Sequence, residues 1–261
     1  MTTRLRPAAV LACLLLAEVS PASAQADLQL WGNLTFDWVR SPQLVYELDF
    51  EPKVLLAAPE GAPGWRNLDL TPNVEYAYKP WLDLVGEATV GRTTQTDAVS
   101  SVEISPRVGV RFHLFSRHVP TPAFAAFFRY SEMLPKRRVV IRDLVRFESR
   151  NLFYSGGEQE SSFTARLRNR LELVVLLGKG RDQLTDDGAK YFLTDWEWFV
   201  PLGTAEERFA NKQRIRMGWG WRRSFAWRYE LVYLWTRSRN TLEEGFSTND
   251  NAIDIRIKRV F

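Results

Sequence analysis

The sequence predicts an all-β protein, a transmembrane antiparallel β-barrel with a best count of twelve strands. The first observation is that apolar and polar residues alternate with a period of two in segment after segment, as in strands with one face in lipid and one in a lumen. The second is an export signal, after which no apolar segment is long enough for a membrane helix. The third is that all ten tryptophans follow that signal, mostly near strand ends or on apolar faces, as in aromatic girdles.

The first 24 residues have the three parts of a secretory signal peptide. Arg4 and Arg6 precede an apolar run at residues 8–17, and residues 22–24 form a small-x-small cleavage site. We therefore expect export, with a signal peptide at 1–24 and one outer-membrane β-barrel domain at 25–261. Because open sheet edges cannot face hydrocarbon, a sheet in the membrane has to close into a barrel.

Composition excludes several classes of protein. Cys13 is the only cysteine and lies within the signal, so the mature chain has neither disulfides nor cysteine ligands. A lipoprotein signal at Cys13 is disfavoured because Leu14, Leu15 and Leu16 continue the apolar run beyond it. The formal net charge of +4 is spread without a basic block, so we expect no nucleic-acid partner. A soluble sandwich with an aromatic-rich core is the alternative fold.

The first five predicted strands all alternate apolar residues with polar or charged ones. They occupy residues 28–39, 43–51, 67–78, 82–91 and 102–114. In the second of them, Tyr46 and Leu48 share one face, whereas Glu47 and Asp49 share the other. Turns and loops that contain proline, glycine or polar residues separate these segments.

Seven further strands complete the predicted barrel. They occupy residues 124–131, 139–154, 162–177, 191–200, 212–221, 227–235 and 253–261. The segment 162–177 alternates most clearly, because its odd positions are apolar except for Asn169 and its even positions include Arg166, Arg168 and Arg170. The segment 124–131 is the shortest and weakest of the candidates before the carboxyl terminus.

The number of strands has a consequence for the ends of the chain. An even number suits a bacterial barrel whose two termini share the periplasmic side. Twelve strands, however, would make the short turn at 41–42 external and the longer loop at 59–64 periplasmic, against the usual pattern. Counts of ten or fourteen are therefore alternatives, with 124–131 the segment most open to miscounting.

The glycine-containing connection at 155–161 predicts that the strands on either side of it form an antiparallel hairpin. Their inward faces carry six arginines and two glutamates, so at least four arginines would lack a partner within the pair. Asp195 and Glu197 are expected to pair with Arg214 and Arg216 on the next strand. The full predicted lumen cluster is Arg142, Arg146, Glu148, Arg150, Arg166, Arg168, Arg170, Glu172, Asp195, Glu197, Arg214, Arg216, Arg228 and Glu230.

Several motifs resemble an uncharacterised family of Gram-negative outer-membrane β-barrels, known as a domain of unknown function. The residues that carry the resemblance lie at 146–150, 166–170 and 207–230, including Arg214-Ile215-Arg216-Met217-Gly218-Trp219-Gly220-Trp221-Arg222. The resemblance covers most of the mature chain and is least distinct in its amino-terminal third. It implies an outer-membrane location and a barrel, but no activity.

The last strand resembles the signal by which the barrel-assembly machinery recognises its clients. Ile253, Ile255 and Ile257 alternate with charged residues up to Phe261. Arg259 departs from the usual pattern, because it takes an outward position that is normally apolar or aromatic. We therefore expect outer-membrane lipid and the assembly machinery as partners, with recognition resting on the three isoleucines and Phe261.

Candidate chemistry is sparse, and we expect neither an enzyme nor a cofactor. A lipid hydrolase of serine and histidine type also needs a group that orients the histidine. Only His113 of the two histidines lies in a predicted strand, and no serine or carboxylate is placed by spacing to activate it. With two histidines and no mature cysteine, the sequence also offers no metal-ligand cluster of recognised spacing.

Two classes of function remain. The first is a narrow, porin-like channel whose arginine-rich lumen favours anionic or polar small solutes, because guanidinium groups stay charged and pair with carboxylates and phosphates. The second is a closed structural or interaction barrel, in which carboxylates neutralise the arginines and side chains fill the bore. Whether the arginines are paired is a matter of geometry, which sequence patterns do not decide.

Overall fold

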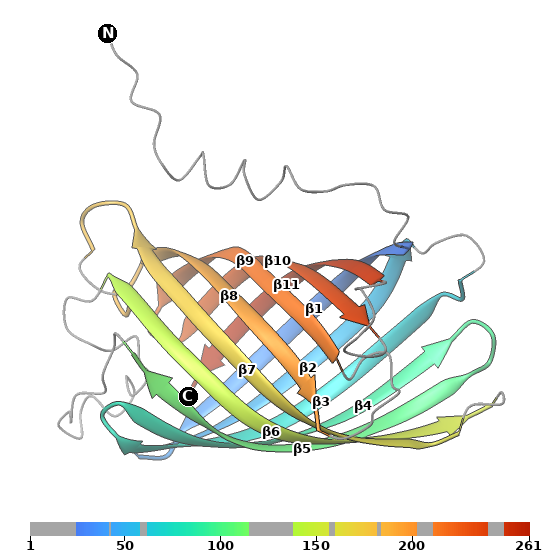
Figure 1. Cartoon of the computed structure of the whole chain (residues 1–261). Helices are drawn as coiled ribbons and strands as arrows, with labels where there is room; N and C mark the ends of the chain where they lie inside the picture. The colour runs from blue at the N-terminus through green and yellow to red at the C-terminus, as the bar shows by residue number, and fades with distance from the viewer. Residues whose placement is uncertain are drawn as a thin grey trace, which may run out of the picture.

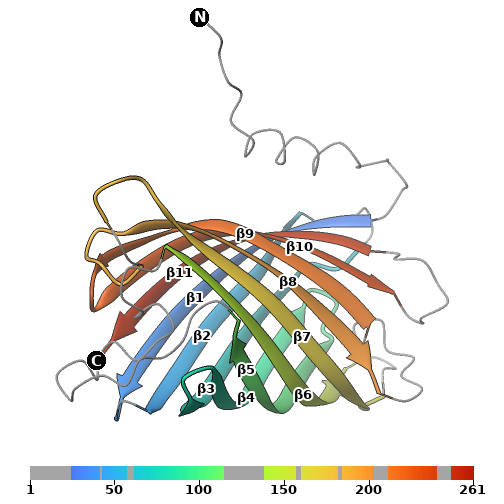
Figure 2. The same ribbon diagram turned by 60° about the vertical axis from the view of Figure 1, so that its left-hand side comes forward.

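The computed structural model describes residues 25–41, 43–57, 62–114, 138–156, 160–181, 184–202, 211–239 and 248–261. These residues form β-strands that close into one barrel of strongly tilted strands (Figure 1). A view from another side shows the same tilt around the cylinder (Figure 2). The predicted signal peptide and the predicted strand at 124–131 lie outside the described residues.

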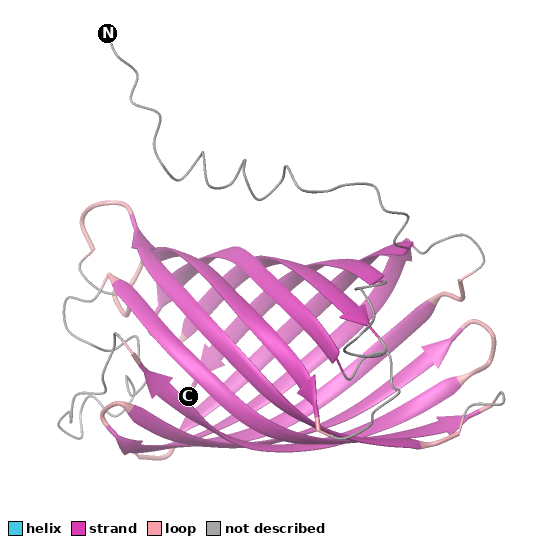
Figure 3. Ribbon diagram, viewed as in Figure 1, coloured by secondary structure: helices cyan, strands magenta, loops and turns pink. Residues whose placement is uncertain are grey.

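Eleven strands make up the described barrel, and every drawn element is a strand or a loop (Figure 3). Their bounds are β1 (Gln25–Val39), β2 (Leu44–Ala57), β3 (Trp65–Lys79), β4 (Leu82–Gln95), β5 (Ser100–His113), β6 (Val139–Ser155), β7 (Ser162–Leu177), β8 (Lys190–Pro201), β9 (Asn211–Ser224), β10 (Trp227–Arg239) and β11 (Thr248–Val260). Within the described residues, no helix has the length and apolar character needed to cross a membrane.

The strand count corrects the prediction of twelve. β5 pairs directly with β6, from Ser100 opposite Ser155 to His113 opposite Arg142, so no strand lies between them. An odd number of strands with antiparallel neighbours leaves the first and last strands running the same way. β1 and β11 accordingly close the barrel as its one parallel pair in the described sheet.

The odd count also separates the two ends of the described chain. β1 begins at one mouth of the barrel and β11 finishes at the other, as the blue and red ribbons show (Figure 1). We call these mouths the Gln25 end and the Phe261 end. The expectation that both termini share one side of the membrane, which depended on an even count, is wrong for this barrel.

The period-two alternation is confirmed throughout the described strands. Phe163 and Trp219 are 66% and 63% exposed on the outside, whereas Val140 and Glu148 are fully buried inside. β6 and β7 pair as the predicted antiparallel hairpin. Each strand therefore presents an apolar face outward and a mainly polar face inward.

An apolar cluster fills part of the interior, from the Phe261 end of β6 to β8 across to β10 and β11. It joins inward residues of β6, β7 and β8 to Leu184 and Ala189 from the connection between β7 and β8. Val232 and Leu234 of β10 belong to the same cluster. Leu184 is only 1% exposed, so this part of the connection packs as tightly as the strand residues of the cluster.

The closing seam ends on Phe261. Its backbone N–H donates to the carbonyl of Asp37 on β1 at 2.8 Å, and its ring stacks on Trp38 with centroids 5.7 Å apart. Arg259 takes an outward position beside it, 4.7 Å from the ring of Trp227 and 5.2 Å from that of Phe261. Cation–π contacts therefore account for this charge among the outer aromatic residues.

Candidate functional site: the charged lumen

The barrel encloses a cavity of about 370 Å³. The described residues that line it include fifteen lysines and arginines and eleven aspartates and glutamates. Of the fourteen predicted lumen residues, twelve line this cavity. The other two, Glu148 and Glu197, are fully buried behind the arginines that contact them.

A closed ring of alternating charges lies on the wall formed by β4 to β8. Its members in order are Glu87, Arg107, Glu148, Arg168, Glu197 and Arg146. Glu148 accepts from Arg107 at 2.5 Å and from Arg168 at 3.0 Å. Glu197 accepts from Arg168 at 2.8 Å and from Arg146 at 2.6 Å. Each buried carboxylate is thus compensated by two guanidinium groups within the ring.

A glycine allows this ring to close. Arg146 on β6 donates to Glu87 on β4, although β5 runs between the two strands. The residue of β5 that faces Arg146 is Gly109. A Cβ there would lie 2.7 Å from Cγ of Arg146 and closer still to the carbonyl oxygen of Val145. The absence of a side chain at this position therefore lets the arginine cross the strand.

The other arginines of the β6–β7 pair find carboxylates either within the pair or on neighbouring strands. Arg150 pairs with Glu103 on β5 at 2.9 Å, and Arg166 with Glu148. Arg142 pairs with Glu172. Only Arg170 among these six has no hydrogen bond or ion pair with a described residue, and its buried Nε has no partner.

The next strands behave largely as expected. Arg216 donates to Asp195 at 2.8 Å and to Glu197 at 3.1 Å. Arg214 lies 3.6 Å from Glu197, and Arg228 lies 3.3 Å from Glu230. The contacts of Arg214 and Arg216 extend the network from β8 to β9, and Arg228 and Glu230 form a pair within β10.

Cations also surround one inward aromatic ring, that of Phe199 on β8. Arg168 and Arg166 of β7 lie 4.5 and 4.8 Å from its centroid, and Lys212 and Arg214 of β9 lie 4.7 and 5.4 Å away. Phe199 is only 2% exposed. The ring of Phe199 therefore lies between cationic side chains of β7 and β9 that would otherwise contact one another.

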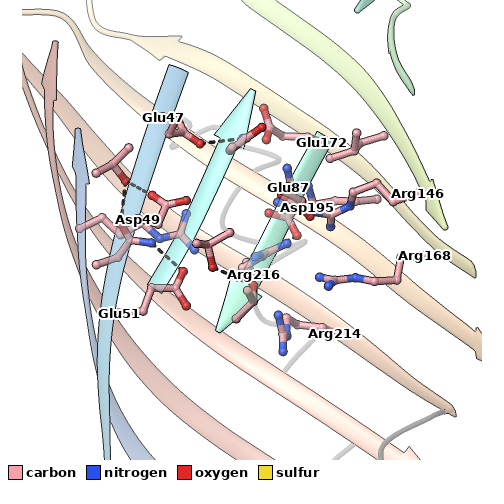
Figure 4. A pocket seen from close by; sticks show the side chains of 18 of the residues that line it. Glu47, Asp49, Glu51, Glu87, Arg146, Arg168, Glu172, Asp195, Arg214 and Arg216 are labelled. Atoms are coloured by element: carbon pink, nitrogen blue, oxygen red, sulfur yellow. Dashed lines mark hydrogen bonds and ion pairs between the residues drawn. The ribbon is translucent and has the colours of Figure 1, made fainter. Parts of the chain in front are cut away.

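An acidic wall faces these arginines across the cavity, and the sequence-based cluster omitted it. Its carboxylates are on β2 and β3 and include Glu47, Asp49 and Glu51 (Figure 4). Lys258 bonds Glu47 at 2.6 Å, and Lys53 lies 2.8 Å from Glu51. The alternation had already placed these carboxylates on the inward face, so the signal was present in the sequence.

His113 has a partner that the sequence did not predict. Its Nε2 lies 2.7 Å from a carboxylate oxygen of Asp83, and both side chains are buried. Asp83 precedes it by 30 residues, on the neighbouring strand, so spacing along the chain did not reveal the pair. Among the described residues, no group of three or more histidine, cysteine, aspartate or glutamate side chains is placed to hold a metal ion.

The predicted assembly residues lie on the outer face. Ile253 and Ile255 are 41% and 49% exposed, Ile257 lies on the same face, and Phe261 is at the seam. Their role in recognition by assembly machinery stays a prediction.

The chain matches no family model and no curated protein. The geometry of the lumen is therefore the basis on which a function is assigned. Guanidinium and carboxylate groups on opposite walls of a polar cavity can hold small charged solutes.

Proposed function

We propose that this protein is an outer-membrane channel with a narrow lumen that admits small anionic or polar solutes. The observation that carries the proposal is the charged cavity. It is lined by residues near both ends of the strands, such as Lys53 and Arg150 towards the Gln25 end and Lys258 and Arg228 towards the Phe261 end. A lumen lined with charge along its length favours water and ions over a dry core.

The arrangement of charge supports a preference for anions. Glu148 and Glu197 neutralise arginines from behind and are fully buried, so the cavity meets the guanidinium groups and not these two carboxylates. Basic side chains outnumber acidic ones in the described lining. A pore with fixed positive charge in excess attracts anions and repels cations.

The location is supported by the export signal, the closed sheet and the apolar outer face. A membrane fraction should contain the protein, and detergent should be needed to extract it. The folded barrel should migrate faster on a gel when it is not boiled. Recovery of folded protein from the soluble periplasm would contradict an outer-membrane location.

Conductance in planar bilayers tests transport. We expect a small, anion-preferring conductance that becomes less anion-selective in Arg170→Gln. This variant is a cleaner probe than joint replacement of Arg166, Arg168 and Arg170, because the first two hold Glu148 and Glu197. Arg92→Gln, on the outer face of β4, is the matched control.

A closed structural or interaction barrel is the second candidate. It is favoured by the six-residue ring and by the apolar cluster that occupies part of the interior. Correctly folded protein that conducts no ions under any applied voltage would support this candidate and overturn the channel.

A further inference from the structure

Two opposing walls of the cavity carry opposite charge. Asp49 and Glu51 lie on one side, and Arg168 and Arg214 lie on the other (Figure 4). Such an arrangement sets an electric field across the lumen, perpendicular to its axis. A solute with separated charges can align with this field, whereas a simple ion cannot.

Asp49 is the carboxylate on the acidic wall that has no cation. Its neighbours Glu47 and Glu51 each contact a lysine. Asp49 accepts a hydrogen bond from Thr35 at 2.5 Å, and no described lysine or arginine lies within 4.0 Å of it. It therefore retains capacity to accept from a cationic donor.

Arg170 is its counterpart on the basic wall. The carboxylates around it are already engaged, Asp195 with Arg216 and Glu172 with Arg142. Among the described residues, Arg170 makes no hydrogen bond or ion pair, and its Nε is buried without an acceptor. A guanidinium group without an acceptor inside a cavity is stabilised only by binding an anion or water.

The two groups lie at similar heights on opposite walls. Strand pairing leads from Asp49 across β3 to β6 and reaches β7 at Thr164, near its start. Pairing in the other direction, across β1, β11 and β10, reaches Arg222 on β9. Arg222 bonds Ala189, just before β8, so this path leads one residue beyond Leu177, past the far end of β7. Because barrel strands are tilted, the level of Asp49 on β7 lies between these points, and Arg170 is there.

We infer that the lumen binds a short zwitterionic solute of peptide type, with its ammonium group at Asp49 and its carboxylate at Arg170. The inference builds on the proposed function, because the solute has to enter the lumen. A cavity of about 370 Å³ is of the size that small ligands occupy. Since the two groups are on opposite walls, a peptide with separated end charges fits better than a single amino acid.

Triglycine is a suitable probe, because only its charged ends can be recognised. Calorimetric titration of the full chain in detergent at low ionic strength should show binding of triglycine. Glycine should bind more weakly, since its charges are too close together. N-acetyl-triglycine amide, which has neither end charge, should not bind. Equal binding of the capped peptide would overturn the inference.

Two variants assign the binding to the proposed groups. Asp49→Asn and Arg170→Gln should each weaken triglycine binding by about tenfold or more, as expected for loss of a charged hydrogen bond. Neither replacement removes an ion pair between described residues, so both should fold, which gel mobility and circular dichroism check. Asp143→Asn and Arg92→Gln make the same chemical changes on the outer face and should bind as the parent does.

The binding and conductance experiments test the zwitterion site and the channel independently. A barrel that conducts anions but does not bind triglycine contradicts the zwitterion site and leaves the channel in place. A barrel that binds triglycine through Asp49 and Arg170 but does not conduct supports the site and overturns the channel. Unchanged binding in both variants would also overturn the site.

Discussion

Glu148 is one of two fully buried glutamates in the charged wall, with Glu197 the other. Its side chain is fully buried and accepts from Arg107, Arg166 and Arg168. Glu172, in contrast, is 19% exposed at its side chain and pairs with Arg142 near the cavity surface. Glu148 therefore compensates three guanidinium groups, whereas Glu172 compensates one.

Glu148→Gln should lower the free energy of unfolding by about 3 to 5 kcal/mol, because three guanidinium groups would lose their common charged acceptor. Glu172→Gln should cost clearly less, since water can reach Arg142. Urea titration of the refolded barrel in lipid vesicles measures both. Equal small losses in the two variants would show that the buried network contributes little to stability.

A second prediction at the scale of single residues concerns Gly109. Gly109→Ala places a methyl group against the backbone of β6 and Cγ of Arg146, so we expect a loss at or above the usual overpacking cost of about 1 to 3 kcal/mol. Gly86→Ala on β4 is the matched control, because its Cβ would meet only Val74 at 3.4 Å. The same urea titration compares them. A larger loss in Gly86→Ala would contradict the crossing role of Gly109.

At the scale of elements, the parallel seam between β1 and β11 is the place where the barrel closes. A chain that has not formed this seam exposes two unpaired strand edges. Phe261 contributes both a backbone hydrogen bond and ring contacts with Phe36 and Trp38 to the seam. Its effect on closure can therefore be separated from any role as an assembly signal.

Deleting Phe261 should reduce the folded outer-membrane fraction and increase periplasmic degradation. Comparison with Phe261→Ala, Trp38→Ala and the double variant in purified, refolded protein isolates the packing contribution. We expect a coupling of about 0.5 to 1.5 kcal/mol between the two rings. If assembly in cells falls no further than this packing loss explains, the assembly signal is not at Phe261.

At the scale of the whole molecule, an odd number of strands determines which turns share a mouth of the barrel. In the eleven-stranded barrel, the end of β3 and the end of β9 lie at the same mouth, whereas the turn after β4 lies at the other. An additional strand between β5 and β6 would place the ends of β3 and β9 on opposite sides. The topology is therefore open to a direct chemical test.

Single cysteines are easily introduced, because the chain has no cysteine after Cys13. A membrane-impermeant maleimide added to intact cells should either label both Lys79→Cys and Arg223→Cys or label neither of them. Asp97→Cys should give the opposite result, because it lies at the other mouth. All three positions are exposed at strand ends or turns. Opposite labelling of Lys79→Cys and Arg223→Cys would contradict eleven strands and favour twelve.

Alternation along the sequence was sufficient to predict most of the fold. Eleven of the twelve predicted segments correspond to strands, and the inward position of residues such as Arg146, Glu172 and Glu230 follows from their parity. This succeeds because side-chain direction in a strand is a local property with a period of two. The twelfth segment, 124–131, lies outside the described residues. The direct pairing of β5 with β6 is a matter of register between strands, which alternation does not encode.

The sequence by itself determined that the strands are amphipathic, that their charged faces lie together and that β6 and β7 form a hairpin. Only the tertiary structure decided which charges meet. Arg150 and Arg146 reach Glu103 and Glu87 on strands that precede them by about 40 to 60 residues in the chain. Closure, tilt and shear of the barrel bring such groups together, and they likewise place Asp49 across the lumen from Arg170, because they depend on pairing around the complete circle and not on any one segment.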